Sequence, residues 1–247
     1  MLPSHGRYEF SPITERPDYR WPNGAGLAFY VALGVEEYRF GDGMTEDILP
    51  RASKPDMVNT SWRDYGNRVG GFRLLDRLAS RGIAPAILLN TEVYDHAPAL
   101  MKAAAAADAE IVGHGRTNSD TLAGMNPEEE LAYLRAVQAR ITAEQGFAAG
   151  GWSSPWLAHT DSTIDLLVEA GFSYLLDLRM DDQPVWFETK STSLLAIPYA
   201  LELNDSSTLI GRPADNRARL RDHDCGRIRR IAEGGGTAAP RHEPGGA

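Results

Sequence analysis

Residues 110–120 read EIVGHGRTNSD, a short apolar run that ends in a polar, glycine-flanked segment. The apolar run predicts a strand, and the segment that begins at His114 predicts a loop. Asn126 then offers an N-cap, Pro127 fits the first helical position, and Glu129 completes a capping box, so a helix is expected next. This order of strand, loop and helix is the repeating unit of α/β proteins.

The same alternation extends in both directions along the chain. The expected strands are 27–35, 83–90, 110–113, 147–151, 174–178 and 193–198, and the expected helices are 70–81, 97–107, 126–141 and 160–170. The first strand is almost continuously apolar, which is typical of a strand buried on both faces. Residues 39–69 are irregular and rich in Gly, Asp and Pro, so they predict a long loop. Strands that alternate with helices predict a parallel sheet or a barrel.

The sequence divides into three parts. Residues 1–25 are polar and dotted with proline, which predicts an ordered lead-in, and residues 26–211 carry the alternating pattern. Residues 212–247 contain eight Arg, no Lys and no aromatic residue, and they show no sustained apolar period. We interpret this tail as a disordered, atypical or truncated C-terminus, so the barrel is expected to be incomplete at that end.

Composition excludes several classes of protein. The formal net charge of −9 disfavours nucleic acid and anionic membranes as partners. A lone cysteine excludes an internal disulfide framework and a thiolate metal cluster. No signal-peptide pattern and no apolar run of about eighteen residues is present, so we expect a cytoplasmic protein. The expected partners are a small-molecule or saccharide substrate and, in a homo-oligomer, further copies of the chain.

Two carboxylates stand at the end of the first predicted strand. Neighbouring side chains in a strand point to opposite faces, so one of Glu36 and Glu37 is expected to face the mouth of a barrel. A carboxylate in that place can act as a general base or as a metal ligand. A solvated strand end explains the same residues equally well.

Further polar and aromatic residues follow the other predicted strands. His114 lies directly after one strand, and its flanking glycines allow the backbone to approach a ligand closely. A loop histidine bonded to a neighbour is the simpler interpretation of His114 alone. Trp152 and Trp156, in a later loop, can form an aromatic wall or can equally belong to the core. The residues expected to shape a substrate pocket are Asn118, Ser153, Ser154, Trp156 and Asn204. Thr160 is expected to cap the helix that it begins, His159 to be a surface or capping group, and Asp177 to lie in a solvated loop.

Taken together, these stretches resemble the polysaccharide deacetylase superfamily, also described as the NodB-homology or carbohydrate esterase 4 type. The likeness is nearest to its intracellular, allantoinase-like branch. It is carried by Gly34–Tyr38, Gly113–Asp120, Gly151–Pro155, Glu169–Tyr174 with Asp177, Asp181–Pro184, and Pro198–Asp205, within residues 7–211. The resemblance implies a distorted (β/α) barrel of about seven strands and an activity against carbon–nitrogen bonds.

The resemblance also implies roles for particular residues. Metal-dependent members use an acidic pair on the first strand, two histidines spaced His-x-x-x-His, an Arg-x-Pro-aromatic segment and a late histidine that acts as general acid. Here the acidic pair corresponds to Glu36 and Glu37, and the first histidine to His114. Asn118 stands where the second histidine is expected and Ser153 where the arginine is, and no late histidine segment follows Ile210.

These substitutions weaken the implied metal site. Zinc favours histidine, cysteine or carboxylate donors, so Asn118 is a poor replacement for histidine. The resemblance therefore implies a weakly held divalent metal such as zinc on Glu37 and His114, or no metal at all.

The expected function is that of a polysaccharide deacetylase-like hydrolase of non-peptide carbon–nitrogen bonds. Its reaction would deacetylate an N-acetylated substrate or open a cyclic ureide such as allantoin, with Glu36 or Glu37 activating water and His114 assisting. The alternatives are a catalytically inactive or truncated relative, and a non-catalytic module that binds a sugar or a purine.

Overall fold

In the computed structural model, the described residues are 5–45 and 56–205. The chain divides into two compact units, of which the first comprises residues Met1–Tyr8 and Tyr30–Ala200. The second unit comprises Glu9–Phe29 and Leu201–Ala247. Its described elements are three short 3-10 turns, η1 Ile13–Glu15, η2 Pro22–Gly24 and η5 Leu201–Leu203.

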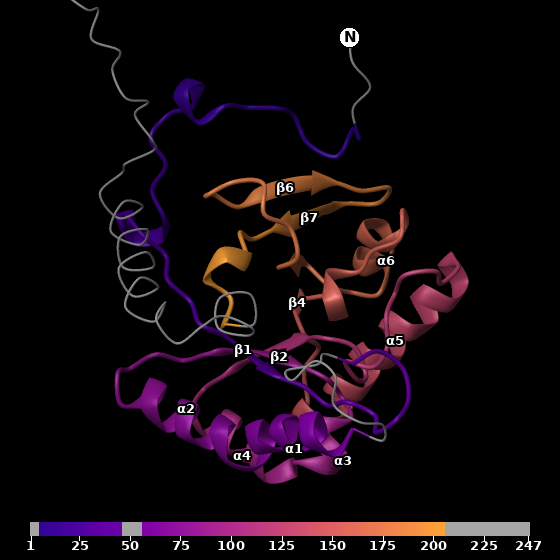
Figure 1. Ribbon diagram of the computed structural model, residues 1–247. Helices are drawn as coiled ribbons and strands as arrows, with labels where there is room; N and C mark the ends of the chain where they lie inside the picture. The colour runs from indigo at the N-terminus through magenta and orange to yellow at the C-terminus, as the bar shows by residue number, and fades with distance from the viewer. Residues whose placement is uncertain (1–4, 46–55, 206–247) are drawn as a thin grey trace, which may run out of the picture. The chain divides into compact units, whose positions relative to one another are not determined.

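The first unit is built on a seven-stranded sheet (Figure 1). Its strands are β1 Ala32–Val35, β2 Ala86–Leu89, β3 Glu110–Gly113, β4 Gly151–Trp152, β5 Tyr174–Leu175, β6 Val185–Glu188 and β7 Ser193–Ala196. The order is β1-β2-β3-β4-β5-β7-β6, and every neighbouring pair is parallel except β6 and β7. The predicted α/β fold with a largely parallel, seven-stranded sheet is confirmed.

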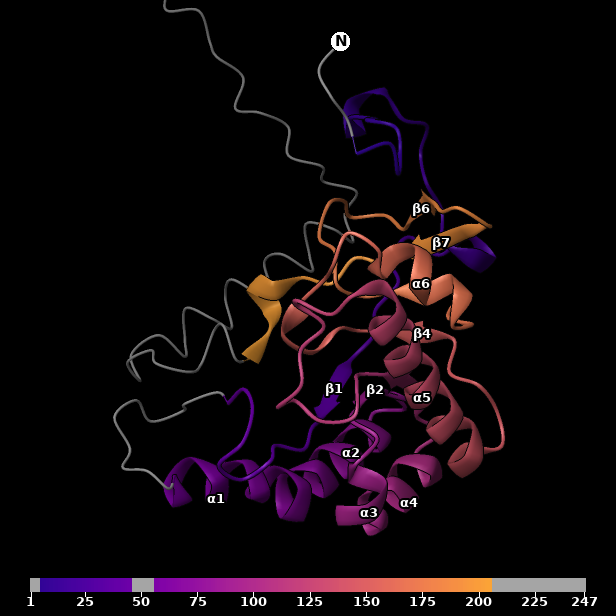
Figure 2. The same ribbon diagram turned by 90° about the vertical axis from the view of Figure 1, so that its right-hand side faces the viewer.

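Helices connect the parallel strands. They are α1 Met57–Tyr65, the π-helical turn η3 Gly66–Gly70, α2 Gly71–Ala79, α3 Val93–His96, α4 Pro98–Ala106, α5 Pro127–Gln145 and α6 Thr163–Glu169, with a 3-10 turn η4 Pro155–Leu157. Helices α1 to α4 gather beside β1 and β2, and α5 and α6 lie beside the middle of the sheet (Figures 1 and 2). No helix among the described residues is both long enough and apolar enough to span a bilayer.

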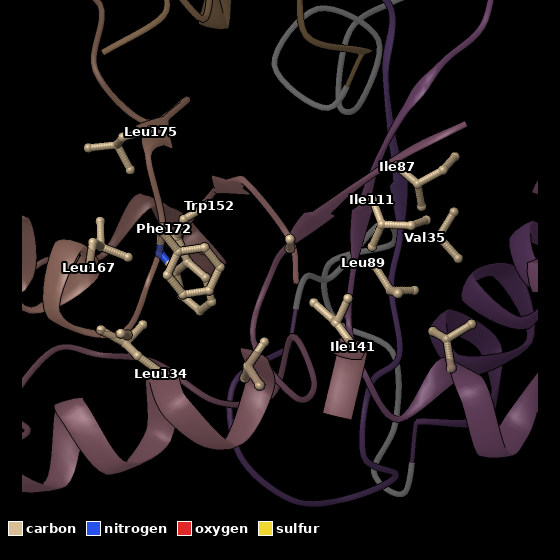
Figure 3. Packing of buried hydrophobic residues seen from close by; sticks show 14 of the residues in the cluster. Val35, Ile87, Leu89, Ile111, Leu134, Ile141, Trp152, Leu167, Phe172 and Leu175 are labelled. Atoms are coloured by element: carbon tan, nitrogen blue, oxygen red, sulfur yellow. The ribbon is translucent and has the colours of Figure 1, made fainter. Parts of the chain in front are cut away.

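The main hydrophobic core lies between the sheet and these helices. Ile87, Leu89 and Ile111 project from β2 and β3 into this layer, and Leu134 and Ile141 of α5 meet it from the helical side (Figure 3). All five are buried. Covering of this kind explains why the central strands read as apolar runs in the sequence.

A second, smaller cluster lies on the other face of the strands. Leu88 and Val112 alternate with the residues of the main core, and Leu176 joins them from the end of β5. Because successive side chains of a strand point to opposite faces, this cluster marks the inner face, which is turned away from the helices. The two faces decide which polar side chains meet beyond the strand ends.

The first predicted strand is only partly correct. Residues 27–35 were expected to form a strand buried on both faces, but β1 spans Ala32–Val35 and only Val35 is buried. The physical reason is position, because β1 is an edge of the sheet among the described residues and pairs there with β2 alone.

The predicted loop over residues 39–69 is wrong in its second half. Helix α1 begins after Asp56, whose side chain accepts a hydrogen bond from the backbone N–H of Asn59. Val58, Trp62 and Tyr65 recur at helical spacing but are exposed, so the apolar stripe points outward. Residues 46–55, in the middle of the predicted loop, lie outside the described residues.

Strand β6 was not predicted. Its Trp186 and Glu188 are exposed and its Phe187 is buried, as expected for a short edge strand with one covered face. The capping box at Asn126 and Glu129 is confirmed. The expected cap at Thr160 is not, because its hydroxyl donates to the buried carboxylate of Glu130 and α6 begins after Ser162.

The tail predicted at residues 212–247, and with it the expected incompleteness of the barrel at its C-terminal end, lies outside the described residues.

One ion pair makes the stability of the first unit depend on pH. The Arg7 guanidinium donates two hydrogen bonds to the Asp165 carboxylate, at 2.7 and 2.9 Å, and the backbone N–H of Lys190 donates a third. The hydrogen bonds from Arg7, ahead of the opposing effect of burial, lower the pKa of Asp165 to about 2. A folded pKa below the unfolded one stabilises the fold above about pH 4, and this contribution is lost as the pH falls toward 2.

We therefore expect Asp165→Asn to lower the free energy of unfolding by about 1.5 kcal/mol at pH 7, a value discounted because Arg7 is partly exposed. The difference should shrink as the pH falls to about 3. Urea unfolding at both pH values measures it, and Asp161→Asn, an exposed neighbour of equal charge, is the control. An equal loss at both pH values would contradict the ion-pair explanation.

Candidate functional site

Three polar side chains meet at the carboxyl ends of β1 and β3. Glu36 follows β1 on its inner face, and His114 follows β3 on the same face. The distance between His114 Nε2 and Glu36 Oε1 is 3.8 Å. Asn118, four residues further along, donates from Nδ2 to Glu36 Oε2 at 2.8 Å. The structure therefore brings together three of the residues predicted from sequence.

Glu36 is held in place through one of its two oxygens. Oε2 accepts from Asn118 Nδ2 and from the hydroxyl of Tyr38, which lies 3.0 Å away. Asn118 Nδ2 also lies 2.9 Å from the Tyr38 hydroxyl, so the three groups form a closed triangle. Oε1 accepts no hydrogen bond from this triangle and faces His114. About a third of the Glu36 side chain is exposed, so Oε1 can meet a ligand or a water molecule.

His114 is oriented by the backbone of the next strand. Its Nδ1 lies 2.7 Å from the carbonyl oxygen of Ser153, and a carbonyl only accepts, so Nδ1 carries a proton. In the neutral ring Nε2 is then an acceptor that faces the carboxylate of Glu36. A separation of 3.8 Å is too long for a direct hydrogen bond. Two facing acceptors are best satisfied by a water molecule that donates to both, or by a proton on His114.

The loop that carries Asn118 is tied to the chain after β1 and to helix α5. The backbone carbonyl of Glu37 accepts from the N–H of Asn118 at 2.7 Å and from the hydroxyl of Thr117. The Tyr133 hydroxyl donates to Asp120 and accepts from a backbone N–H of the same loop. Burial raises the pKa of Tyr133, which keeps this hydroxyl protonated as a donor. The position of Asn118 is therefore set by backbone contacts and not by its side chain alone.

Trp156 forms an aromatic wall beside the triangle. Its ring lies edge-on to Tyr38, with ring centroids 6.4 Å apart, and its indole N–H donates to the backbone carbonyl of Asn118 at 2.7 Å. Its backbone has φ of +61°, a conformation that bulky side chains rarely adopt. Strain of this kind persists where surrounding contacts fix the residue. The structure brings Trp156 to the site, and its pocket role stays a prediction.

The two serines of the next loop lie differently. Ser153 is buried at the site and bonds to His114 through its backbone carbonyl. The hydroxyl of Ser154 instead accepts from Trp152 Nε1, and its backbone N–H donates to both oxygens of Asp177. The structure thus brings Ser153 to the site and turns the side chain of Ser154 toward the core.

Asp177 also pairs with a histidine that the sequence suggested was a surface or capping group. The distance between His159 Nε2 and Asp177 Oδ2 is 2.7 Å, and the Asp177 side chain is completely buried. Asp177 was expected in a solvated loop, and this expectation is wrong. The pair fixes the segment that follows β4, and with it the Ser153 carbonyl that orients His114.

Glu37 faces the opposite side from Glu36. Its Oε1 lies 3.1 Å from His96 Nδ1, and it lines an open crevice of about 490 Å³ together with Phe72 and Leu100. The expectation that only one of the two glutamates faces the mouth is therefore met by Glu36. The structure does not bring Glu37 and His114 together, so it does not support the predicted metal pair.

The residues present do not fit a tightly held zinc ion. Among the described residues that meet at the gap, Glu36 and His114 are the good zinc donors, whereas a strong tetrahedral site needs at least three protein ligands. Asn118 already presents its N–H₂ group to Glu36, and among the described residues no group of three His, Cys, Asp or Glu side chains could hold a metal.

This reasoning gives a testable prediction about zinc. Asn118→His restores a histidine four residues after His114 and supplies a third donor beside Glu36, so we expect zinc affinity to rise at least about tenfold over the unchanged chain. Isothermal titration with zinc measures the change. Asn118→His combined with His114→Ala is the control and should lose the gain. Equal affinities for all three proteins would show that these positions do not form one site.

Asn204 belongs to the second unit, where its backbone N–H donates to Leu201. Its predicted pocket role stays a prediction.

Sequence reasoning missed Tyr38 and Asn90 as site residues. Asn90 is completely buried, accepts from the backbone N–H of Glu37 and donates to the backbone carbonyl of His114. Its position directly after β2 was the available signal for this role.

Comparison with known proteins finds solved structures that share this fold. Three solved structures match with a TM-score of 0.73: a protein from Mycobacterium smegmatis assigned to the polysaccharide deacetylases, one from Pseudomonas aeruginosa PAO1 with the same assignment, and PuuE allantoinase. Their sequence identities are 21%, 24% and 22%; the matches cover 91%, 88% and 88% of this chain and 79%, 77% and 76% of theirs. At these identities the likeness shows a shared fold.

One curated protein adds a sequence match. The peptidoglycan deacetylase of Helicobacter pylori (strain ATCC 700392 / 26695) is 30% identical over 105 residues, which are 42% of this chain. The matched part spans only 36% of that protein's length. No family model matches the chain.

Proposed function

We propose that this chain, which has the fold of the polysaccharide deacetylase superfamily, is a hydrolase of non-peptide carbon–nitrogen bonds. The observation that carries the proposal is the 3.8 Å gap between Glu36 Oε1 and His114 Nε2 at the carboxyl ends of two strands. In open and closed α/β folds these ends are where active sites lie. The gap suits a water molecule that donates to both groups and presents its lone pairs to a carbonyl carbon.

In the proposed reaction Glu36 acts first as general base. It takes a proton from the water, the hydroxide oxygen bonds to the carbonyl carbon, and the carbonyl oxygen gains the negative charge. Glu36 then returns the proton to the nitrogen as the carbon–nitrogen bond breaks. An N-acetylated amine gives acetic acid and the free amine, and a cyclic ureide gives one opened molecule that carries a carboxylic or carbamic acid group and the released N–H group. General acid–base transfer of this kind contributes about 10² to 10⁴ in rate.

His114 has two possible tasks, which depend on its proton. As a neutral ring, with Nδ1–H bonded to Ser153, it accepts a hydrogen bond from the attacking water through Nε2. As an imidazolium it donates from Nε2 to the developing oxyanion. Both tasks use the same orientation of the ring, which the Ser153 carbonyl fixes.

Names of similar proteins suggest the substrate class. Two matched structures are assigned to polysaccharide deacetylases, a third is an allantoinase, and the curated relative is a peptidoglycan deacetylase. We infer that the substrate is an N-acetylated amine or a cyclic ureide. A cytoplasmic location and a homo-oligomeric state belong to the same proposal, on the composition of the sequence alone.

A hydrolase screen tests the proposal. The purified chain is incubated with allantoin, hydantoin and N-acetylated sugars, with and without zinc, and released amine or opened ring is measured. Turnover that disappears in Glu36→Gln supports the proposal. A folded, pure chain that hydrolyses none of these compounds would contradict it, and binding without turnover would favour the inactive or binding-module alternative. The presence of Ser153 where the resemblance implies arginine supports that alternative.

A further inference from the structure

The side-chain oxygen of Asn118 is a buried acceptor that has no hydrogen-bond partner in the described part of the chain. The residue as a whole is only 6% exposed. Its amide cannot be reversed, because Nδ2 faces the Glu36 carboxylate, which only accepts. A buried acceptor without a donor is costly, so such a group calls for a missing partner.

Among the described residues, the nearest donors to Asn118 are already engaged. Asn118 Nδ2 and the Tyr38 hydroxyl both donate to Glu36, and the indole N–H of Trp156 donates to the backbone carbonyl of Asn118. Around the gap, in the described part of the chain, three acceptors are left for a ligand: Asn118 Oδ1, Glu36 Oε1 and, in the neutral ring, His114 Nε2. A ligand that completes this set must bring hydrogen-bond donors.

We propose that Asn118 is a specificity-determining residue whose Oδ1 accepts a hydrogen bond from an N–H group adjacent to the scissile carbonyl. The proposal rests on the proposed function for the place of that carbonyl, beside Glu36 and His114. Esters and fully substituted amides carry no such N–H and leave Oδ1 unsatisfied. A site built to bond an N–H rejects analogues that lack it, because its own polar group then stays buried and unpaired.

The geometry of the Asn118 amide fixes where a bound N–H group lies. Oδ1 and Nδ2 belong to the same planar amide group, and Nδ2 is bonded to Glu36 and Tyr38. An N–H group that donates to Oδ1 therefore lies directly beside the Glu36–Tyr38 contact. Oδ1 is closed to solvent in this structure. The ligand therefore reaches it only as neighbouring side chains adjust.

Binding of small inert probes tests the inference without any turnover. Imidazolidin-2-one carries an N–H on each side of its carbonyl, cyclopentanone replaces each N–H with CH₂, and 1,3-dimethylimidazolidin-2-one blocks both. Dissociation constants for the intact chain are measured by ligand-observed NMR. We expect imidazolidin-2-one to bind at least about tenfold more tightly than either analogue, the effect of one hydrogen bond to a buried acceptor.

Two variants assign the preference to Asn118. Asn118→Ala should reduce the preference, as a ratio of dissociation constants, to between about onefold and twofold, since the acceptor is gone. Tyr38→Phe removes the other contact to Glu36 but leaves Oδ1 in place, so it should keep the preference. A melting curve for each variant confirms folding, and the comparison of probes on the unchanged chain remains decisive if Asn118→Ala does not fold.

The outcomes separate this inference from the proposed function. Equal binding of the three probes, or no binding of any probe up to about 100 mM, would overturn the role of Asn118 even if the chain hydrolyses a substrate. A clear N–H preference in a chain that hydrolyses nothing would support the role of Asn118 and count against the hydrolase.

Discussion

Replacing Glu36 with Gln is expected to lower kcat about a thousandfold, with KM changed far less. The carboxamide has nearly the same shape as the carboxylate but cannot take a proton from water. Its oxygen can still accept from Asn118 and Tyr38, which leaves its N–H₂ facing His114 Nε2 as a donor. The fold should therefore persist while the chemistry is lost, and steady-state kinetics on whichever substrate the screen identifies measures the change.

Glu37→Gln provides a matched control for this variant. It removes the same charge from the adjacent residue, but its carboxylate faces His96 on the other side of the strand end. We expect kcat of Glu37→Gln to fall less than about tenfold, because the side chain of residue 37 contacts neither Glu36 nor His114. If Glu37→Gln were the more damaging of the two, the assignment of the base to the inner face would be wrong.

Replacing His114 with Ala should cost at least about a hundredfold in rate. The ring is the second group at the proposed water site, and its loss also frees the Ser153 carbonyl that orients it. Added imidazole can enter the vacated space, so partial recovery of the rate is expected. His96→Ala, which removes an exposed histidine beside Glu37, is the control and should change the rate little. Unchanged turnover in His114→Ala would remove the residue from the mechanism.

The sequence predicted the site's location better than its internal contacts. Alternating strands and helices placed Glu36, His114, Ser153 and Trp156 at strand ends, and parallel strands bring such ends together. Sequence could not decide between Glu36 and Glu37, because the choice depends on strand parity and the predicted first strand began five residues too early. Only the pairing of β1 with β2 fixes that parity.

Other features escaped sequence reasoning because they depend on contacts far apart in the chain. Tyr38 reaches the site only because the chain after β1 turns back toward Asn118, 80 residues later. His159 was expected at the surface because its partner Asp177 lies 18 residues later and no local sequence pattern predicts their pairing. Helix α1 was missed because the Gly, Asp and Pro of residues 39–69 favoured a loop, although apolar residues recur at helical spacing within Met57–Tyr65.

The enclosed amide of Asn90 has a consequence for how such a site can change. Its two ends join the chain after β1 to the chain after β3, and neither end reaches solvent. The spacing between Glu36 and His114 is thus set by the two buried hydrogen bonds of Asn90 and not by the outer loops. Loops at the rim can accordingly diversify, and with them the molecules that are recognised, while the distance across the reacting pair stays constant.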